Sequence, residues 1–404
     1  MPKTAISVET ARSIVLGHPF PIIEEEVYLH HAGGRVLTEA IVADRDFPAF
    51  DRVSMDGIVV QHHKLQEGQT FKVQGVQLAG MPAMSLQGPA YALEIMTGAV
   101  CPPNGDTVIP VEQLTFFQDN GQKMVRIGPP PPQGKNIHLQ GFDRKEGEVL
   151  ITPGTKLGQA EAGVCATVGK QKVKVARLPK VAVISTGDEL VEVHQQPAPY
   201  QIRMSNGVVL QAALQEIGID ASFFHLTDEL ASLTAWLGSI MEQHDVLLLS
   251  GGVSKGKADH IPQALEEVGV KKHFHRVSQR PGKPFWFGTA GSKTLFAFPG
   301  NPVSTFVNYH VYFLPWLRQS LGLAPLPART AILAQDVSFK PALTNFLQVR
   351  LEQGAGAALH AHPQKGKGSG DLANLLVCDA LLELPNDGRD VFTAGDQFSI
   401  IPVR

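Results

Sequence analysis

Two carboxylates, a hydroxyl and a glycine follow one apolar segment of the chain. The segment 181–185 leads directly into Thr186, Gly187, Asp188 and Glu189. Carboxylate oxygens suit a hard divalent cation, which prefers oxygen ligands. Asp188 is equally well explained as a helix N-cap, a position at which aspartate is favoured. Glu189 is therefore the stronger candidate for metal-dependent chemistry.

A glycine-rich turn follows a second apolar segment, 246–250. It contains Ser250, Gly251, Gly252, Ser254 and Asp259. Glycines let backbone N–H groups approach an anion, and serine and lysine side chains add donors, so the turn is a candidate phosphate cradle. A tight turn from a strand into a helix requires glycine in any case, and this structural explanation stays open.

Further polar turns offer cations, an amide and a carboxylate. Arg280 and Lys283 lie on a proline-stiffened turn and could hold an anion, with a solvated surface turn as the alternative. A third apolar segment, 294–298, is followed by Pro299, Gly300, Asn301 and Pro302. Asp56 and Thr97 occupy glycine-adjacent turns elsewhere, where turn chemistry by itself explains them.

The three apolar segments predict the element that positions these turns. Continuous apolar runs are typical of buried parallel strands, and helical patterns lie between the first two runs and after the third. We therefore expect a doubly wound α/β domain over 179–326. The carboxyl ends of its parallel strands share one edge of the sheet, where open α/β sheets bind ligands. The polar turns should face a single site at that edge.

The flanking regions have different patterns. Ser7 or Thr10 begins a predicted helix, and a second helix is predicted in the stretch that ends at Val36 and Leu37. Short apolar runs between glycines and prolines predict a β-rich domain from about 45 to 140, with a hairpin around Asn120. Alternating runs at 346–351 and 398–403 predict a compact C-terminal β domain.

The composition is that of an ordinary globular protein of several domains. At about 150 residues per domain, 404 residues give roughly two to four domains. A net charge of −3 gives no field that would hold a long nucleic acid by its phosphates. No stretch reaches the ~18 apolar residues that cross a bilayer. We therefore expect no nucleic-acid partner and no membrane partner.

Cysteine usage and the N-terminal segment indicate the compartment. Cys101, Cys165 and Cys378 lie far apart, which supports neither a disulfide framework nor a zinc knuckle. The first residues lack the apolar core of a secretory signal. We expect a cytoplasmic protein.

Several motifs occur in an order that resembles the molybdopterin molybdenumtransferase family, which includes bacterial MoeA and the E domain of gephyrin. They are FDRVSMDG (50–57), MTGA (96–99), STGDEL (185–190), SN (205–206), SGGVSKGKAD (250–259), RPGKP (280–284), FPGNPVS (298–304) and GSGDLANL (368–375). Each is modest by itself, but the resemblance runs nearly end to end.

The resemblance implies a multidomain fold of α/β and β parts. The implied domains are an elongated domain I (1–45 and 141–178), an inserted β-rich domain II (46–140), a doubly wound α/β molybdopterin-binding domain III (179–326) and a barrel-like C-terminal β domain IV (327–404). It also implies a homodimer whose site lies between domains III and IV of one subunit and domain II of its partner. An upstream molybdopterin adenylyltransferase is the implied second partner.

The implied reaction belongs to molybdenum cofactor biosynthesis. Adenylated molybdopterin and molybdate are the substrates, and Mg2+ is the cofactor. The adenylate is hydrolysed, and molybdate is inserted into the dithiolene. In physical terms the site must hold a phosphate, a metal ion and an oxyanion together.

The resemblance assigns roles residue by residue. Glu189 and Asp259 would hold Mg2+ and orient the pterin, with Asp188 as a further metal ligand and Asp228 as a second-rank candidate. Asp56 and Thr97 would reach in from the partner subunit. Lys283 and Arg280 would hold molybdate or phosphate. The implied catalytic residues are Glu189, Asp259, Asp56 and Lys283. The remaining implied substrate contacts are Thr186, Gly187, Ser250, Gly251, Gly252, Ser254, Pro299, Gly300, Asn301, Pro302 and Ser369.

Two departures from the family pattern fall in the β-rich region, and other functions stay open. Ile58 stands where the family generally has tyrosine, and the stretch 138–142 replaces an arginine-rich one. The alternatives are a catalytically reduced paralogue that acts as a pterin-binding or scaffolding dimer, a tungstate-inserting variant, and a general nucleotide hydrolase.

Overall fold

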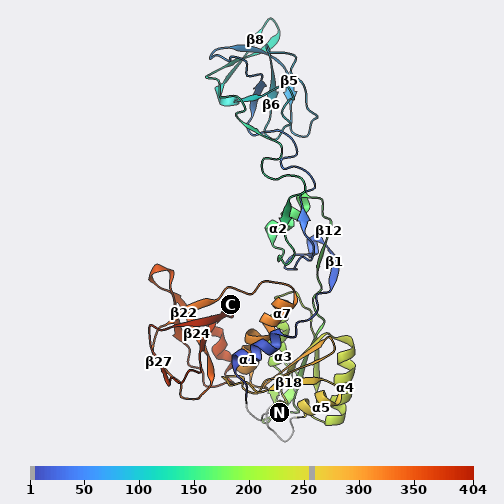
Figure 1. Ribbon diagram of the computed structural model, residues 1–404, viewed down its shortest axis with the longest axis vertical. Coiled ribbons are helices and arrows are strands. Elements are labelled where there is room, and N and C mark those ends of the chain that lie inside the picture. Colours follow the sequence, from blue (N-terminus) through green and yellow to red (C-terminus); the bar gives the residue numbers. More distant parts are fainter. Residues whose placement is uncertain (1–4, 254–259) are drawn as a thin grey trace. The chain divides into compact units, whose positions relative to one another are not determined.

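The computed structural model describes residues 5–253 and 260–404, which form two compact units (Figure 1). Unit 1 consists of residues 1–38, 154–158 and 173–404, and unit 2 of residues 39–153 and 159–172, within those described ranges. None of the described helices combines the length and the apolar character that crossing a membrane requires.

A six-stranded sheet forms the centre of unit 1. Its order is β16 (Ser222–Leu226), β13 (Val181–Thr186), β17 (Val246–Ser250), β21 (Lys293–Phe298), β20 (Trp286–Ala290) and β18 (Lys271–His275). The first four strands are parallel, and the last two are antiparallel to their neighbours. The three apolar segments of the sequence are thus adjacent parallel strands, as predicted.

Helices cover both faces of this sheet (Figure 1). One face packs against α1 (Val8–Leu16), α3 (Asn206–Gln215), α6 (Pro302–Asn308), the π-helix η3 (Tyr309–Phe313) and α7 (Leu314–Ser320). The other face packs against α4 (Leu230–Gln243) and α5 (Ile261–Glu267). Val183 faces the first set and Ile184 the second, because successive strand side chains point to opposite faces. The predicted doubly wound architecture is confirmed.

A closed barrel follows at the C-terminus of unit 1. Its five strands are β24 (Thr344–Gln353), β25 (Leu359–Pro363), β22 (Arg329–Leu333), β28 (Gln397–Pro402) and β26 (Ala380–Leu384), and pairing of β26 with β24 closes the ring. The strand β19 (Gln279–Arg280) adds to β24 in parallel. Shorter elements are β23 (Val337–Ser338), β27 (Val391–Phe392), η4 (Ala355–Ala357) and η5 (Leu372–Val377).

The N-terminal region confirms one of its two predicted helices. In α1 the Ser7 hydroxyl caps the helix by accepting a hydrogen bond from Thr10 N. The second predicted helix is wrong: the chain forms β1 (Glu24–Tyr28), the 3-10 turn η1 (Leu29–His31) and isolated bridges at Val36 and Leu37. The strand β1 pairs with β12 (Lys172–Ala176), and its burial alternates along the strand. A positive φ of 79° at Gly34 is incompatible with a continuing helix.

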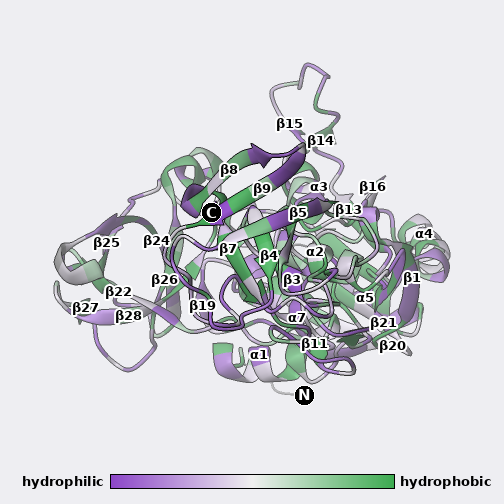
Figure 2. Ribbon diagram, turned by 90° about the horizontal axis from the view of Figure 1, so that it is seen from above, coloured by the Kyte–Doolittle hydropathy of each residue, from purple (hydrophilic) through white to green (hydrophobic). Residues whose placement is uncertain are grey.

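Unit 2 is built on a second six-stranded sheet. Its order is β7 (Thr107–Pro110), β4 (Gly57–Val60), β6 (Tyr91–Ile95), β5 (Thr70–Gln77), β9 (Gln122–Ile127) and β8 (Leu114–Asp119). The remaining elements are β2 (Ile41–Val42), β3 (Arg52–Val53), η2 (Val111–Gln113), β10 (Ile137–His138), β11 (Val149–Ile151) and α2 (Gln159–Thr167). Strands β4 and β7 are fully buried and apolar except for Thr107, whereas β9 mixes apolar and polar residues (Figure 2). The predicted hairpin is β8 and β9, with positive φ at Asn120 and Gly121.

Candidate functional site

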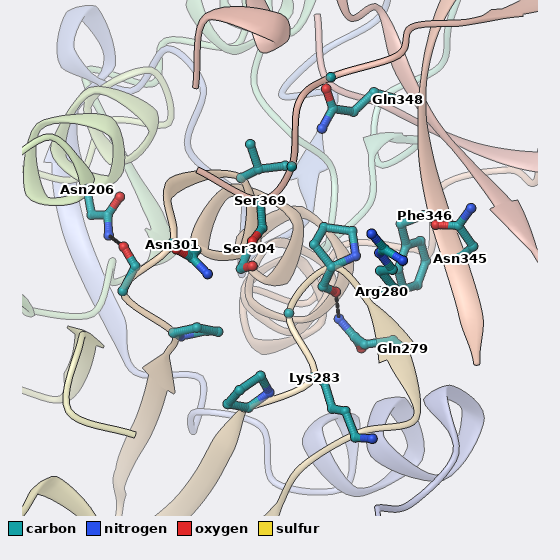
Figure 3. Close-up of a pocket in the computed structure, with 18 of the residues that line it drawn as sticks. Asn206, Gln279, Arg280, Lys283, Asn301, Ser304, Asn345, Phe346, Gln348 and Ser369 are labelled. Atoms are coloured by element: carbon teal, nitrogen blue, oxygen red, sulfur yellow. Dashed lines mark hydrogen bonds between the residues drawn. The ribbon is translucent and has the colours of Figure 1, made fainter. Parts of the chain in front are cut away.

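A cleft of about 1340 Å3 lies within unit 1 between the α/β sheet and the C-terminal barrel (Figure 3). One side consists of the turns that follow β13, β17 and β21, and a loop at 279–284 lies beside them. The barrel contributes residues 335–339 and 343, residues 345–348 of β24, and the segment 363–369 except residue 367.

The strand register brings the three polar turns to one level. Ser185 of β13 pairs with Ser250 of β17, and Ser250 in turn pairs with Phe298 of β21. The turns therefore leave the sheet side by side at its carboxyl edge, where ligands bind in open α/β sheets. The prediction that they face one site is confirmed.

The turn after β17 is packed too tightly for any residue but glycine. Gly251 has φ 105°, and a Cβ atom there would lie 2.5 Å from the Thr186 carbonyl oxygen. Gly252 has φ 63°, and its Cβ would lie 2.6 Å from Ile261 Cγ1. Gly251 N–H donates to the Phe298 carbonyl (3.1 Å), so in this geometry it is not available to an anion. The Thr186 hydroxyl beside it is buried and has no hydrogen-bond partner among residues 5–253 and 260–404.

Asn206, at the start of α3, connects two of the turns. Its Nδ2 donates to Ser250 Oγ and to the Gly300 carbonyl, both at 2.7 Å. Its Oδ1 is buried, and no group in the described part of the chain pairs with it. Sequence reasoning used the Ser205-Asn206 pair as a motif but did not select Asn206 as a site residue, because a lone polar residue at a helix start has no distinctive local signal.

The acidic turn after β13 places Glu189 in the cleft. Glu189 is exposed, and its carboxylate folds back over Gly187, where a Cβ atom would lie 2.5 Å from Glu189 Oε2. Asp188 caps no helix, since the chain continues into β14 (Leu190–Val191), which pairs with β15 (Ile202–Arg203). Its Oδ1 instead accepts a hydrogen bond from Asp228 N (3.3 Å).

Two carboxylates and the Thr186 hydroxyl give this turn oxygen ligands of the kind that a hard cation prefers. Asp188 and Glu189 are exposed, and Thr186 Oγ1 has no hydrogen-bond partner in the part of the chain that the structure describes. Among the described residues no three His, Cys, Asp or Glu side chains are grouped closely enough to hold a metal ion. Asp259, the third predicted ligand, lies outside the described residues.

Positive charge lines the cleft beside these turns. Arg280 and Lys283 are exposed at the two ends of a loop whose centre, Gly282, is buried. The barrel adds Lys365, and Ser369 lies next to α6, where its carbonyl accepts from Val303 N (3.1 Å). Sequence reasoning missed Lys365 and the neighbouring Gln348, since their position depends on how the barrel closes rather than on a local motif.

Most of the predicted site residues line this cleft. They are Thr186, Gly187, Glu189, Asp228, Ser250, Gly251, Gly252, Arg280, Lys283, Pro299, Gly300, Asn301 and Ser369. Asp188 and Pro302 belong to the same turns but are not part of the lining. Ser254, like Asp259, lies outside the described residues.

Asp56 and Thr97 lie in unit 2 and bind each other. Asp56 Oδ1 accepts hydrogen bonds from Thr97 N (2.7 Å) and from Thr97 Oγ1 (2.8 Å). The bond from the Thr97 backbone N–H, and then the bond from its side chain, lower the pKa of Asp56. The pair links two turns, in agreement with the turn chemistry considered for each residue.

The two departures from the family pattern differ in their structural effect. Ile58 is fully buried in β4, so the missing tyrosine does not change an exposed surface. Phe142 is 74% exposed, and its ring meets His138 edge-on at 5.3 Å. His138 Nε2 lies 3.0 Å from Asp143 Oδ1. An aromatic and an imidazole therefore occupy the surface of this stretch.

Three family models match the chain in sequence order. The MoeA N-terminal region (domains I and II) matches residues 6–169, a probable molybdopterin binding domain matches residues 182–319, and the MoeA C-terminal region (domain IV) matches residues 330–403.

Curated relatives and solved structures agree with these matches. The chain is 38% identical to the molybdopterin molybdenumtransferase of Synechocystis sp., over 97% of this chain and 98% of the relative. The enzyme of the same name from Haemophilus influenzae is 34% identical over 78% of each chain. Two crystal structures of MoeA proteins from Pyrococcus horikoshii have TM-scores of 0.84 and 0.80, with 31% and 26% identity. The two matches cover 99% and 98% of this chain, and 100% and 99% of the respective Pyrococcus chains.

Proposed function

The chain belongs to the molybdopterin molybdenumtransferase family and acts in molybdenum cofactor biosynthesis. From this premise we propose that its cleft hydrolyses adenylated molybdopterin and inserts molybdate into the dithiolene. The observation that carries the proposal is the juxtaposition, in one cleft, of the carboxylate Glu189, the Thr186 hydroxyl, which no described residue pairs, and the cations Arg280 and Lys283. A nucleotide-linked pterin and a tetrahedral oxyanion require these complementary groups.

The cationic side of the cleft is proposed to bind the oxyanion. Arg280 presents a planar set of N–H donors, and Lys283 a compact ammonium group, so together they suit an anion with several oxygens. Ser369 and the amide of Asn301 line the same cleft and can donate further hydrogen bonds. These contacts hold molybdate near the dithiolene before the reaction.

The acidic turn is proposed to hold Mg2+ at the phosphoanhydride. Glu189 and Asp188 would bind the ion, with Asp259 as the third carboxylate, and the Thr186 hydroxyl fits the same oxygen chemistry. When bound, Mg2+ offsets the negative charge that develops on the phosphate oxygens. Water attacks a phosphorus atom of the phosphoanhydride and the bridging P–O bond breaks, so that molybdopterin keeps one phosphate, AMP leaves with the other, and the proton of the attacking water passes to the solvent.

The turns at the sheet edge are proposed to orient the pterin and its phosphate. Asn206 joins the Ser250 turn to the Gly300 turn, which makes the two turns one rigid surface. Asp228 lies at the opposite end of this edge and can accept hydrogen bonds from the pterin. Preorganised groups of this kind need no rearrangement as the reaction proceeds.

The working form is proposed to be a homodimer in which Asp56 and Thr97 of unit 2 complete the partner's cleft. The hydrogen bonds between them hold the Asp56 carboxylate in one orientation and keep it ionised. A molybdopterin adenylyltransferase would supply the substrate. We place the reaction in the cytoplasm, with no nucleic acid or membrane as partner, as the composition suggests.

A paralogue that binds pterin without catalysis is not favoured. Relatives named as the transferase match nearly the whole chain, and the carboxylate and the cations of the cleft are all present. Tungstate has the same charge and nearly the same size as molybdate, so both oxyanions belong in the test.

The proposal is tested by a single-turnover assay. The purified protein is mixed with adenylated molybdopterin and Mg2+, with molybdate, tungstate or neither, and AMP release and metal-loaded cofactor are followed. Oxyanion-dependent AMP release with cofactor formation supports the transferase and identifies its metal. Tight substrate binding without turnover would contradict the proposal and favour a paralogue that kept the pterin site.

A further inference from the structure

Three buried polar side chains lie directly beneath the loop that carries Arg280 and Lys283. Gln279 and Asn308 are 0% exposed, and Tyr312 is 1% exposed. They come from β19, the end of α6 and the π-helix η3. Burial of polar groups is costly unless they are paired, so their partners indicate what they hold in place.

The hydrogen bonds of this cluster run toward the loop backbone. The Tyr312 hydroxyl donates to Gln279 Oε1. Gln279 Nε2 donates to the Pro281 carbonyl and to Asn308 Oδ1, both at 2.9 Å, and the first of these bonds is drawn in Figure 3. Asn308 Nδ2 donates to the Gly282 carbonyl (3.4 Å). Amide donors therefore hold the carbonyl groups of two consecutive loop residues.

The Tyr312 hydroxyl is fixed as a donor. Burial raises the pKa of Tyr312, so the phenol keeps its proton at any physiological pH. Gln279 Oε1 is consequently the acceptor, and its Nε2 is left to donate to the two oxygens on its other side. Each member of the cluster thus determines the orientation of the next.

The loop leaves no free space above the cluster. Gly282 has φ 88°, and a Cβ there would lie 2.7 Å from Asn308 Oδ1 and 2.9 Å from Gln279 Nε2. Val277 N donates to the Lys283 carbonyl (3.0 Å), which closes the loop at its base. The centre of the loop is therefore fixed, and the exposed side chains of Arg280 and Lys283 start from fixed backbone positions on either side of it.

We propose that Gln279, Asn308 and Tyr312 are positioning residues that set the spacing of the Arg280 and Lys283 cations and, through it, the affinity of the cleft for its oxyanion. The inference rests on the proposed function, in which this loop binds molybdate. Cations that are already placed bind an oxyanion without reorganisation, whereas a displacement of about 1 Å can lower a rate by a factor of about 100.

Two variants that keep the size of the cluster test the inference. Gln279→Glu replaces the amide donor with an oxygen that faces two other oxygens, and Tyr312→Phe removes one hydroxyl. The molybdate and adenylated molybdopterin concentrations are varied separately in steady-state assays. We expect Gln279→Glu to raise the KM for molybdate about tenfold or more and Tyr312→Phe to raise it about threefold, with the KM for the pterin substrate changed less than about twofold.

Ser320→Ala is the matched control. Ser320 is 2% exposed on α7, and its hydroxyl accepts a hydrogen bond from Phe20 N (2.9 Å), a residue outside both the loop and the cluster. This variant loses a buried hydrogen bond of the same kind, so its Tm should fall while its KM for molybdate stays at the wild-type value. If Gln279→Glu fails to fold, Tyr312→Phe carries the comparison.

The outcomes separate this inference from the proposed function. An equal rise of both KM values, or a lower Tm with the molybdate KM unchanged as in the control, would overturn the positioning role. Failure of the wild-type protein to insert any oxyanion would overturn the proposed function instead. In that case, equilibrium binding of molybdate to the wild type and to both variants still decides whether the cluster sets oxyanion affinity.

Discussion

The Nδ2 atom of Asn206 lies 2.7 Å from the Oγ atom of Ser250, and the same nitrogen donates to the carbonyl of Gly300. One amide at the start of α3 therefore joins the turns after β17 and β21. In the described residues, neither α5 nor α6, the helices that follow these turns, has a cap hydrogen bond from the side chain of its N-cap residue. The shared contact explains how two separate strand ends present one continuous surface to a ligand.

Loss of this contact should weaken both turns. Asn206→Ala leaves the Ser250 hydroxyl and the Gly300 carbonyl without this donor, and we expect a destabilisation of about 1–3 kcal/mol together with weaker pterin binding. Urea unfolding and equilibrium binding of molybdopterin measure the two effects. Gln211→Ala, on the same helix, removes a longer bond to the Ala221 carbonyl (3.3 Å) and serves as the control. Equal pterin affinity in both variants would contradict the bridging role of Asn206.

Glu189→Gln tests the proposed metal-binding turn. The substitution keeps the size of the exposed side chain but removes its charge, so folding should be unaffected while Mg2+-dependent AMP release is lost. Circular dichroism and the single-turnover assay measure the two properties, and removal of Mg2+ with a chelator should reproduce the defect in the wild type. Unchanged AMP release by the variant would remove Glu189 from the mechanism.

Lys283→Ala tests the cationic loop directly. The lysine side chain is exposed in the cleft, so its removal costs a charge-assisted contact of about 1.5–3 kcal/mol, or roughly tenfold or more in the molybdate concentration required. Added salt should weaken molybdate binding less in the variant than in the wild type, because one cation fewer is screened. A molybdate dependence equal to the wild type would assign Lys283 to the structure of the loop.

The strand ends were predictable from the sequence, but the opposite wall of the cleft was not. Buried parallel strands are apolar along their whole length, and this pattern identified β13, β17 and β21 with the turns that follow them. The antiparallel strands β20 and β18 were not predicted as members of this sheet, because β20 is placed by its pairing with β21 and β18 by its pairing with β20. Gln348 lies on β24 and Lys365 follows β25, so both reach the cleft through the pairing of the barrel strands, which no short motif marks.

The N-terminal error has a similar physical origin. Apolar residues such as Val36 and Leu37 fit a helical spacing, but their burial comes from bridges to Lys156 and Val175, far along the chain. Gly34 was the local signal of a turn, whereas the alternating burial of β1 is visible only in the structure. Partner strands distant in sequence decided the outcome.

Thr97→Ala should raise the pKa of Asp56. The Thr97 backbone N–H and hydroxyl bonds lower this pKa, so removal of the hydroxyl returns it part of the way toward the usual aspartate value. Because the folded-state pKa is lowered, the stabilisation by this pair is present above the unfolded-state pKa and is lost as the pH falls through the folded-state value. A carboxyl-detected NMR titration of Asp56 in both proteins measures the shift, and identical titration curves would contradict the assigned cause.

A pair of glycine variants tests how tightly the turn after β17 is packed. At Gly251, φ is 105° and a Cβ atom would lie 2.5 Å from the carbonyl oxygen of Thr186, which is backbone and cannot turn aside. We expect Gly251→Ala to destabilise unit 1 by more than about 2 kcal/mol, since a clash adds to the cost of a left-handed backbone for a residue other than glycine.

At Gly300 the nearest atom to a Cβ, Gly251 Cα, lies 3.8 Å away, so Gly300→Ala should cost less than about 1 kcal/mol. Urea unfolding followed by the fluorescence of Trp286 and Trp316, which are both buried in this unit, measures the difference. Equal midpoints for the two variants would mean that the turn after β17 relaxes, and the tight contact between Gly251 and Thr186 would then not define the shape of the anion site.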